Sequence, residues 1–138
     1  MSNQGRAAST LALECPPGSA YDEDTFGYLL TIERARAERS RQPIRLLFAT
    51  VEPVPGTPVP ISPSSAARLF EGLKRSVRET DVMGWYRQDR VAGVVLGARA
   101  DTPGPVMSGL IEQRVGERLR QRLPSKIARS LRVSVIQQ

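Results

Sequence analysis

The sequence predicts an α+β domain: a ferredoxin-like β-α-β-β-α-β unit preceded by one additional helix. The 138 residues, 40% hydrophobic and 25% charged, match the size and composition of a soluble domain with one core. Helical and strand periodicities alternate along the chain in the order α-β-α-β-β-α-β. Without its first helix, this order is the split β-α-β unit, whose sheet is antiparallel with both long helices on one face.

The N-terminal part predicts a disordered segment followed by a helix. Residues 1–21 are rich in Ser, Ala, Gly and Pro and lack periodicity, so we place the folded domain at residues 22–138. The acidic run that begins at Asp22 supplies the cap and the negative charge of a helix start. Apolar residues then recur at helical spacing: Phe26, Leu29, Leu30 and Ala37.

A strand, a proline-rich connection and a second helix follow. Residues 44–51 are almost continuously apolar, which favours a central strand covered on both faces. Residues 52–63 hold five prolines, so they suit neither a helix nor a central strand. Ser62 followed by Pro63 is typical of an N-cap with proline at the first helical position, and the helix should end near Thr80.

The second half predicts a hairpin, a basic helix and a last strand. Residues 81–86 and 91–98 have strand character, and residues 87–90 form the turn between them. A helix with apolar residues from Met107 to Leu123 ends at Pro124. The last strand has alternating apolar positions at Leu131, Val133 and Val135.

The apolar faces of these elements together define the expected core. Its residues are Phe26, Leu30, Leu46, Phe48, Leu69, Phe70, Leu73, Val94, Leu96, Leu110 and Val133. Trp85 and Tyr86 are neighbours in one strand and therefore face opposite sides of the sheet. We expect one of them in the core and the other at the surface.

Composition excludes several kinds of site. The chain has no His, so it can form neither a Ser-His nor a Cys-His nucleophile and offers no imidazole metal ligand. Cys15 is the single cysteine, which excludes an intrachain disulfide. No apolar run reaches the length of a membrane span, so we expect a cytoplasmic protein. The net charge of +6 suits an anionic partner or, alternatively, solvated helix faces rich in Arg.

Residues 78–91 resemble the signature region of a known family. Arg78 and Asp81 form an Arg-x-x-Asp motif, and five residues separate it from the turn. In the GGDEF domains, the diguanylate cyclases of bacterial signalling, the same spacing leads from Arg-x-x-Asp to Gly-Gly-Asp/Glu-Glu-Phe. The chain from about Phe26 onward therefore resembles a truncated GGDEF-like domain, with no counterpart of the family's last helix and strand after Gln138. Its signature loop is degenerate and reads Arg87, Gln88, Asp89, Arg90 and Val91.

The resemblance implies that catalysis has been lost. An active member needs two carboxylates that converge on a divalent metal and a triphosphate. Thr50 occupies the position of the first carboxylate, and the family's third signature residue is retained as Asp89. Side chains at Arg87 and Gln88 replace the glycines that let the substrate approach the backbone. We therefore expect no enzyme activity, no metal and no cofactor, and an active cyclase is the disfavoured alternative.

Two binding roles remain open in this resemblance. The family uses Arg-x-x-Asp to bind cyclic di-GMP, so Arg78 and Asp81 are the candidate ligand-binding residues, or else solvated residues between a helix and a strand. Otherwise the domain is a regulatory or scaffolding module with a protein partner, as the family's link to exopolysaccharide or biofilm control suggests. A homodimer is left open. A basic stripe could bind an acidic partner, but the central strands lack an aromatic platform, so we expect no nucleic acid. The stripe consists of Arg114, Arg118 and Arg122.

Overall fold

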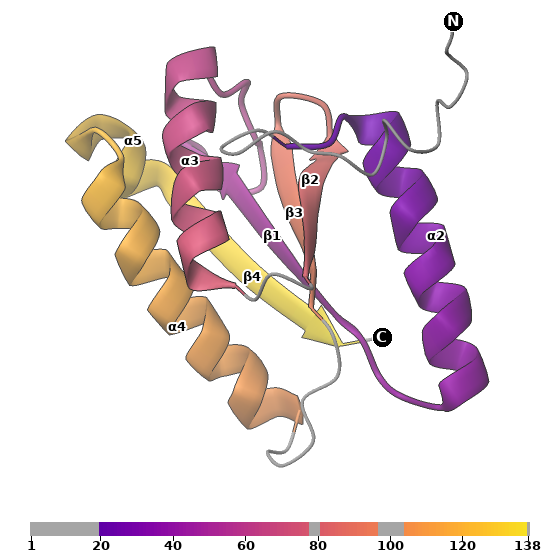
Figure 1. The fold of residues 1–138 in the computed structure, drawn as a ribbon. Coiled ribbons are helices and arrows are strands. Elements are labelled where there is room, and N and C mark those ends of the chain that lie inside the picture. The colour runs from indigo at the N-terminus through magenta and orange to yellow at the C-terminus, as the bar shows by residue number, and fades with distance from the viewer. Residues whose placement is uncertain (1–19, 78–80, 97–103, 138) are drawn as a thin grey trace, which may run out of the picture.

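The computed structural model describes residues 20–77, 81–96 and 104–137. Figure 1 shows how the elements follow one another in space. In chain order they are α2 (Glu23–Ser40), β1 (Arg45–Val51), α3 (Pro63–Ser76), β2 (Val82–Arg87), β3 (Val91–Leu96), α4 (Gly104–Arg122), α5 (Ser125–Ser130) and β4 (Leu131–Gln137).

The four strands form one sheet in the order β2-β3-β1-β4, and each neighbouring pair is antiparallel. With α3 and α4 as the connecting helices, this order is the predicted ferredoxin-like unit. β1 lies between β3 and β4, and six of its seven residues are buried. The prediction of a central strand covered on both faces is therefore confirmed.

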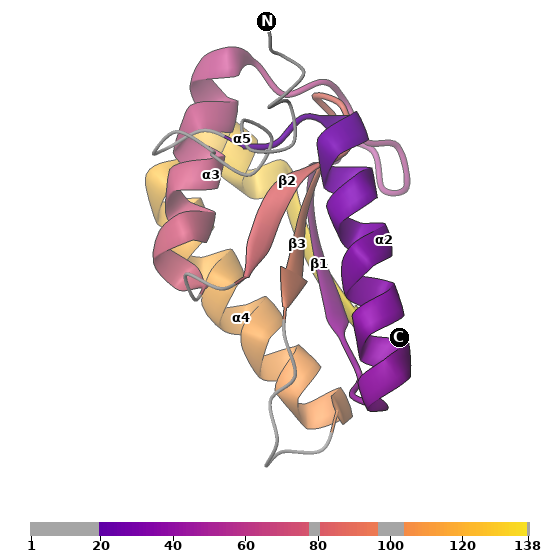
Figure 2. The same cartoon turned by 45° about the vertical axis from the view of Figure 1, so that its right-hand side comes forward.

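Helices cover both faces of the sheet, as Figures 1 and 2 show from two directions. The long helices α3 and α4 share one face, as predicted, and α2 covers the other. The larger core cluster lies between the sheet and α3 and α4, with Leu47, Leu73 and Leu119 fully buried. The smaller cluster lies under α2 and includes Phe26 and Leu46.

Two glycines let α2 approach the sheet closely. Gly84 of β2 and Gly93 of β3 are paired in the register, and the ring of Phe26 lies over both. A Cβ at Gly84 would come within 3.0 Å of Phe26 Cδ1, and one at Gly93 within 3.0 Å of Phe26 Cζ. The backbone N–H of Trp85 also donates to the carbonyl of Tyr21 over 2.9 Å. Tyr21, the final residue of the segment predicted to be disordered, is thus paired with β2, and residues 1–19 lie outside the described residues.

The predicted helix starts are confirmed by side-chain caps. Asp22 Oδ1 accepts a hydrogen bond from the N–H of Thr25 over 2.8 Å at the start of α2. Ser62 Oγ accepts from the N–H of Ser65 over 3.3 Å, and Pro63 is the first residue of α3. These caps satisfy N–H groups that the first turn of a helix cannot pair internally. α3 ends at Ser76, before the predicted Thr80, which lies outside the described residues.

The predicted core is largely confirmed. Its buried members are Phe26, Leu30, Leu46, Leu69, Phe70, Leu73, Val94 and Leu96, while Phe48 and Val133 are half-buried. The prediction for Leu110 was wrong, because this side chain is 50% exposed. Val115 and Leu119 are the α4 residues that reach the core. Leu110 precedes Leu119 by nine residues, about two and a half helical turns, and so points the other way.

The two adjacent aromatic residues lie on opposite faces of the sheet, as predicted. Trp85 is buried and packs edge-on against Phe70, with ring centroids 5.0 Å apart. Tyr86 is half-buried on the α2 face, where its ring centroid is 4.8 Å from that of Phe48. The short helix α5 after Pro124 was not predicted. Among the described helices, none combines the length and the apolar character that crossing a membrane requires.

Candidate functional site

The predicted signature residues form the turn between β2 and β3, at one end of the sheet. The N–H of Arg90 donates to the carbonyl of Arg87 over 3.0 Å and closes the turn. Asp89 has a φ of 62°, in the left-handed region that Asp tolerates better than most residues. The guanidinium of Arg87 lies 4.4 Å from the ring centroid of Tyr86 and donates to the Tyr86 carbonyl. The turn is thus an exposed but well-bonded hairpin.

The first residue of α2 holds this hairpin by two reciprocal hydrogen bonds, which we call the Glu23–Gln88 bridge. The N–H of Gln88 donates to Glu23 Oε1 over 2.7 Å. In return, the N–H of Glu23 donates to Gln88 Oε1 over 3.0 Å. The second bond satisfies a first-turn N–H of α2, where a carboxylate is also favourable. The bridge thus engages the backbone N–H of Gln88, at a signature position where GGDEF domains have a glycine.

The proline-rich connection holds the other side of the hairpin. The N–H of Ile61 donates to the carbonyl of Asp89 over 2.7 Å, and Arg90 Nη1 donates to the carbonyl of Pro58 over 3.4 Å. The carboxylate of Asp89 accepts a hydrogen bond from Gln88 Nε2 over 3.2 Å. The hairpin is therefore fixed by contacts from both α2 and the β1–α3 connection.

The end of β1 carries a carboxylate that is already engaged. The hydroxyl of Thr50, a buried residue, donates to Glu52 Oε2, and the N–H of Gly56 donates to Glu52 Oε1 over 2.9 Å. The hydrogen bond from Thr50 lowers the pKa of Glu52 below its ordinary value, with further contributions from the Gly56 N–H and the charge of Arg132. Both oxygens of Glu52 thus stabilise the turn that follows β1.

The acidic residues that the structure describes do not form a metal centre. Within residues 20–77, 81–96 and 104–137, no group of three or more His, Cys, Asp or Glu side chains could hold a metal ion. The retained carboxylate of Asp89 has its hydrogen-bond partner within the hairpin, at Gln88.

Of the second predicted site, Arg78 with Asp81, the structure describes Asp81 alone, and Arg78 lies outside the described residues. Asp81 directly precedes β2 and is half-buried, whereas the hairpin turn follows the last residue of that strand. The structure therefore separates Asp81 from the hairpin by the length of a strand.

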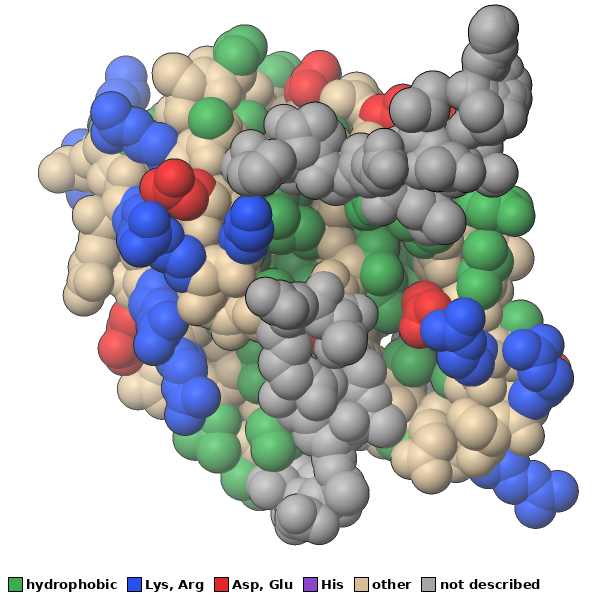
Figure 3. All heavy atoms as spheres, viewed as in Figure 1, with side chains coloured by type: hydrophobic (Ala, Val, Ile, Leu, Met, Phe, Trp, Pro, Cys, Tyr) green, Lys and Arg blue, Asp and Glu red, His purple; other side chains and the backbone are tan. Residues whose placement is uncertain are grey.

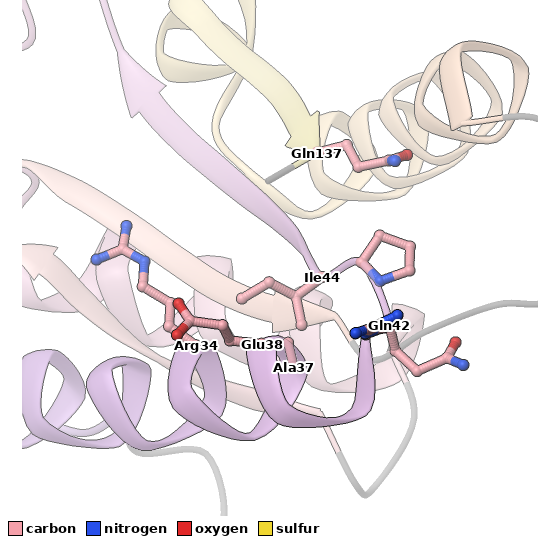
Figure 4. A pocket seen from close by; sticks show the side chains of 8 residues that line it. Arg34, Ala37, Glu38, Gln42, Ile44 and Gln137 are labelled. Atoms are coloured by element: carbon pink, nitrogen blue, oxygen red, sulfur yellow. The ribbon is translucent and has the colours of Figure 1, made fainter.

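One open hollow involves none of the predicted site residues. It has a volume of about 620 Å³ and lies between the C-terminal part of α2, the α2–β1 connection and Gln137 of β4. Figure 4 shows Arg34 and Glu38 on α2 and Ile44 along its wall. Its lining mixes charged, amide and aliphatic side chains.

Sequence reasoning identified the hairpin residues but missed the contacts that define their role. Glu23 and Gln88 are 65 positions apart, so no local spacing pattern links them. The sequence predicts the acidic run at Asp22 as a helix start. The contact of its neighbour Glu23 with the hairpin follows only from the packing of α2 over β2 and β3.

Comparisons with known proteins support the fold. No family model and no curated protein matches this chain. A solved structure of the GGDEF domain alone of PA1120 (TpbB or YfiN) from Pseudomonas aeruginosa is similar, with a TM-score of 0.50 and 14% sequence identity. The match covers 88% of this chain and 72% of that one. The chain therefore has a GGDEF-like fold.

Proposed function

We propose that this GGDEF-like domain is a catalytically inactive regulatory or scaffolding module of bacterial signalling that works in the cytoplasm. The observation that carries the proposal is the Glu23–Gln88 bridge. It turns the signature hairpin into a support for α2, with the Gln88 N–H and side chain both engaged inside the protein. The resemblance to GGDEF domains further suggests a role in exopolysaccharide or biofilm control.

The chemistry of the remaining residues agrees with this proposal. Diguanylate cyclases depend on metal ions that neutralise charge on a triphosphate, and the metal needs carboxylate ligands at fixed positions. At the first of these positions Thr50 has a hydroxyl in place of a carboxylate, and this hydroxyl donates a hydrogen bond to Glu52. At the fourth signature position Arg90 offers a cation, which contacts Pro58.

A turnover assay tests the loss of catalysis. Purified protein is incubated with GTP and either Mg²⁺ or Mn²⁺, and cyclic di-GMP is quantified by mass spectrometry beside an Asp89→Ala variant. We expect no product above the no-enzyme control for either protein. Product that is formed by the natural chain and lost in Asp89→Ala would contradict the proposal.

Binding of cyclic di-GMP through Arg78 and Asp81 is the second candidate. Asp81 directly precedes β2, so it lies the length of a strand from the contacts that occupy the hairpin. A guanidinium and a carboxylate can together read the phosphate and the guanine edge of such a ligand.

Calorimetry with cyclic di-GMP decides this second candidate. Arg78→Ala removes a charge-assisted bond worth about 1.5–3 kcal/mol, so affinity should fall roughly tenfold to a hundredfold. Asp81→Asn should also weaken binding, whereas Arg114→Ala on α4 should leave it unchanged. If Arg114→Ala weakens binding as much as Arg78→Ala does, the attraction is general electrostatics and the motif has no binding role.

A further inference from the structure

The net charge of the chain is concentrated on one helical layer. The helices on that face, α3, α4 and α5, contain nine basic and three acidic residues, a net charge of +6 that equals the net charge of the whole chain. On the opposite face, α2 contains three basic and four acidic residues. Figure 3 shows basic side chains running down the side of the molecule formed by α3 and α4.

One row of side chains on α4 is apolar at its start and basic further on. We call this row the α4 ridge: Val106, Leu110, Arg114, Arg118 and Arg122, each four residues from the next. Residues at this spacing are neighbours on a helix surface. Val106 is 56% exposed and Leu110 is 50% exposed, so the apolar end of the ridge faces solvent. Hydrophobic side chains are visible below the basic row in Figure 3.

The basic end of the ridge is joined to α3. Arg118 Nη1 donates to the backbone carbonyl of Arg75 over 3.2 Å, and Arg122 forms an ion pair with Glu71 at 3.0 Å. The helices touch closely here, since a Cβ added at Gly72 would lie 2.7 Å from Leu119 Cδ2. Arg75 of α3 therefore flanks the ridge.

Two cations of this surface remain available to a partner. Arg75 and Arg114 are exposed, and neither side chain forms an ion pair with another residue in the part of the chain that the structure describes. Exposed positive charges raise the association rate of an anionic partner. The solvent-exposed apolar side chains provide hydrophobic surface that the bound partner can bury.

We propose that the α4 ridge, together with Arg75, is the docking surface for an acidic amphipathic helix of a partner protein. The apolar side chains of that helix would cover Val106 and Leu110, and its carboxylates would pair with the cations. Among the described residues this layer exposes no large aromatic side chain on which a base could stack, since exposed Tyr28 lies on α2, and so a protein fits better than RNA. This inference rests on the proposed scaffolding role and names its partner class.

The probe is a synthetic helical peptide about 20 residues long, labelled with fluorescein. One of its faces carries two Leu followed by three Glu at four-residue spacing, which matches the ridge. Its scrambled version and single-stranded polyuridine of similar length are the comparison probes. Anisotropy is measured with the full chain at physiological salt, beside circular dichroism to confirm folding and sedimentation to detect dimers.

The variants separate the ridge from general charge. Arg75→Glu with Arg114→Glu reverses two cations at the ridge, and Leu110→Ser removes an apolar anchor. Matched controls on α2 are Arg39→Glu, an exposed cation, and Tyr28→Ser, whose side chain is 66% exposed.

We expect saturable binding of the amphipathic peptide, weakened about tenfold or more by the charge reversals and severalfold by Leu110→Ser. The α2 variants should bind as the natural chain does. No binding, equal binding of the scrambled peptide, tighter binding of polyuridine or equal loss in Arg39→Glu would overturn the proposal. A dimer that Leu110→Ser dissociates would overturn it too, because the ridge would then be occupied by a second copy. These outcomes do not depend on the GTP turnover assay, so a failed docking surface and a retained cyclase activity are distinguishable.

Discussion

Thr50 and Glu52 form a hydrogen-bonded unit where β1 ends. The Thr50 hydroxyl and the Gly56 N–H both donate hydrogen bonds to the Glu52 carboxylate. Arg132 on β4 lies opposite Thr50 of β1 and adds a favourable positive charge. Hydrogen bonds to the ionised form lower the pKa of Glu52. The carboxylate therefore stabilises the folded chain only while it is ionised.

Glu52→Gln should remove a pH-dependent part of stability. Because the folded pKa of Glu52 is lowered, its contribution is fully present above the unfolded value of about 4.3 and is lost as pH falls through the folded pKa. The natural chain should melt at a higher temperature than Glu52→Gln at neutral pH, and the difference should shrink in acid. Thermal melts of both proteins from neutral to acidic pH measure this difference in melting temperature. A difference that is independent of pH would contradict the role given to the ionised Glu52 carboxylate.

Arg45 is a charged residue in an unfavourable place. It is 2% exposed at the start of β1, and its Nε and Nη1 atoms are buried without a hydrogen-bond partner among the residues that the structure describes. Burial of such donors costs free energy that a hydrophobic side chain of similar length avoids. We expect Arg45→Met to raise the melting temperature, by an amount equivalent to about 1–4 kcal/mol. A variant that melts earlier than the natural chain would show that the guanidinium is needed for folding.

At the residue scale, the sequence identified the residues of the candidate site but not what their side chains do. Thr50, Arg87, Gln88 and Arg90 differ from the GGDEF pattern that the sequence resembles, and spacing alone identifies them. Thr50 and Arg87 bond to the nearby Glu52 and Tyr86, whereas the partners of Gln88 and Arg90 lie on α2 and in the proline-rich connection, far away in sequence. Contacts of this kind depend on tertiary packing, which no local pattern encodes.

At the element scale, the Glu23–Gln88 bridge ties α2 to the β2–β3 hairpin. Glu23→Ala and Gln88→Ala should each lower the free energy of unfolding by about 1 kcal/mol, the usual net value of such hydrogen bonds. Because each substitution removes a different one of the two hydrogen bonds, the double variant should lose about the sum of the two single losses. Urea unfolding of the four proteins measures these losses, and single losses close to zero would mean that the bridge contributes nothing to stability.

Elements with local signals were predictable, and those set by packing were not. The caps at Asp22 and Ser62 act within one helical turn, so the starts of α2 and α3 followed from the sequence. Helix α5 has no side-chain cap and no buried residue, which leaves little pattern to recognise. Leu110 matched the apolar repeat of α4, but the orientation of that helix is set by Val115 and Leu119.

At the scale of the whole molecule, the sheet separates two cores, and the larger one joins α3, α4 and all four strands. Leu73→Ala should cost roughly 2–5 kcal/mol, because this side chain is fully buried in that core. Leu110→Ala is the matched control, and it should change stability by less than about 0.5 kcal/mol, since half of the side chain is exposed. Equal losses in denaturant unfolding would contradict the placement of α4.

The most direct measurement is a calorimetric titration of the natural chain with GTP in the presence of Mg²⁺ or Mn²⁺. The hairpin is bonded to α2 through Glu23 and to the proline-rich connection through Ile61 and Arg90, so the Gln88 N–H and the Asp89 carbonyl are already engaged within the protein. We predict no saturable heat of binding, both for the natural chain and for Asp89→Ala. Saturable, metal-dependent GTP binding that Asp89→Ala abolishes would contradict the proposal that this hairpin is structural.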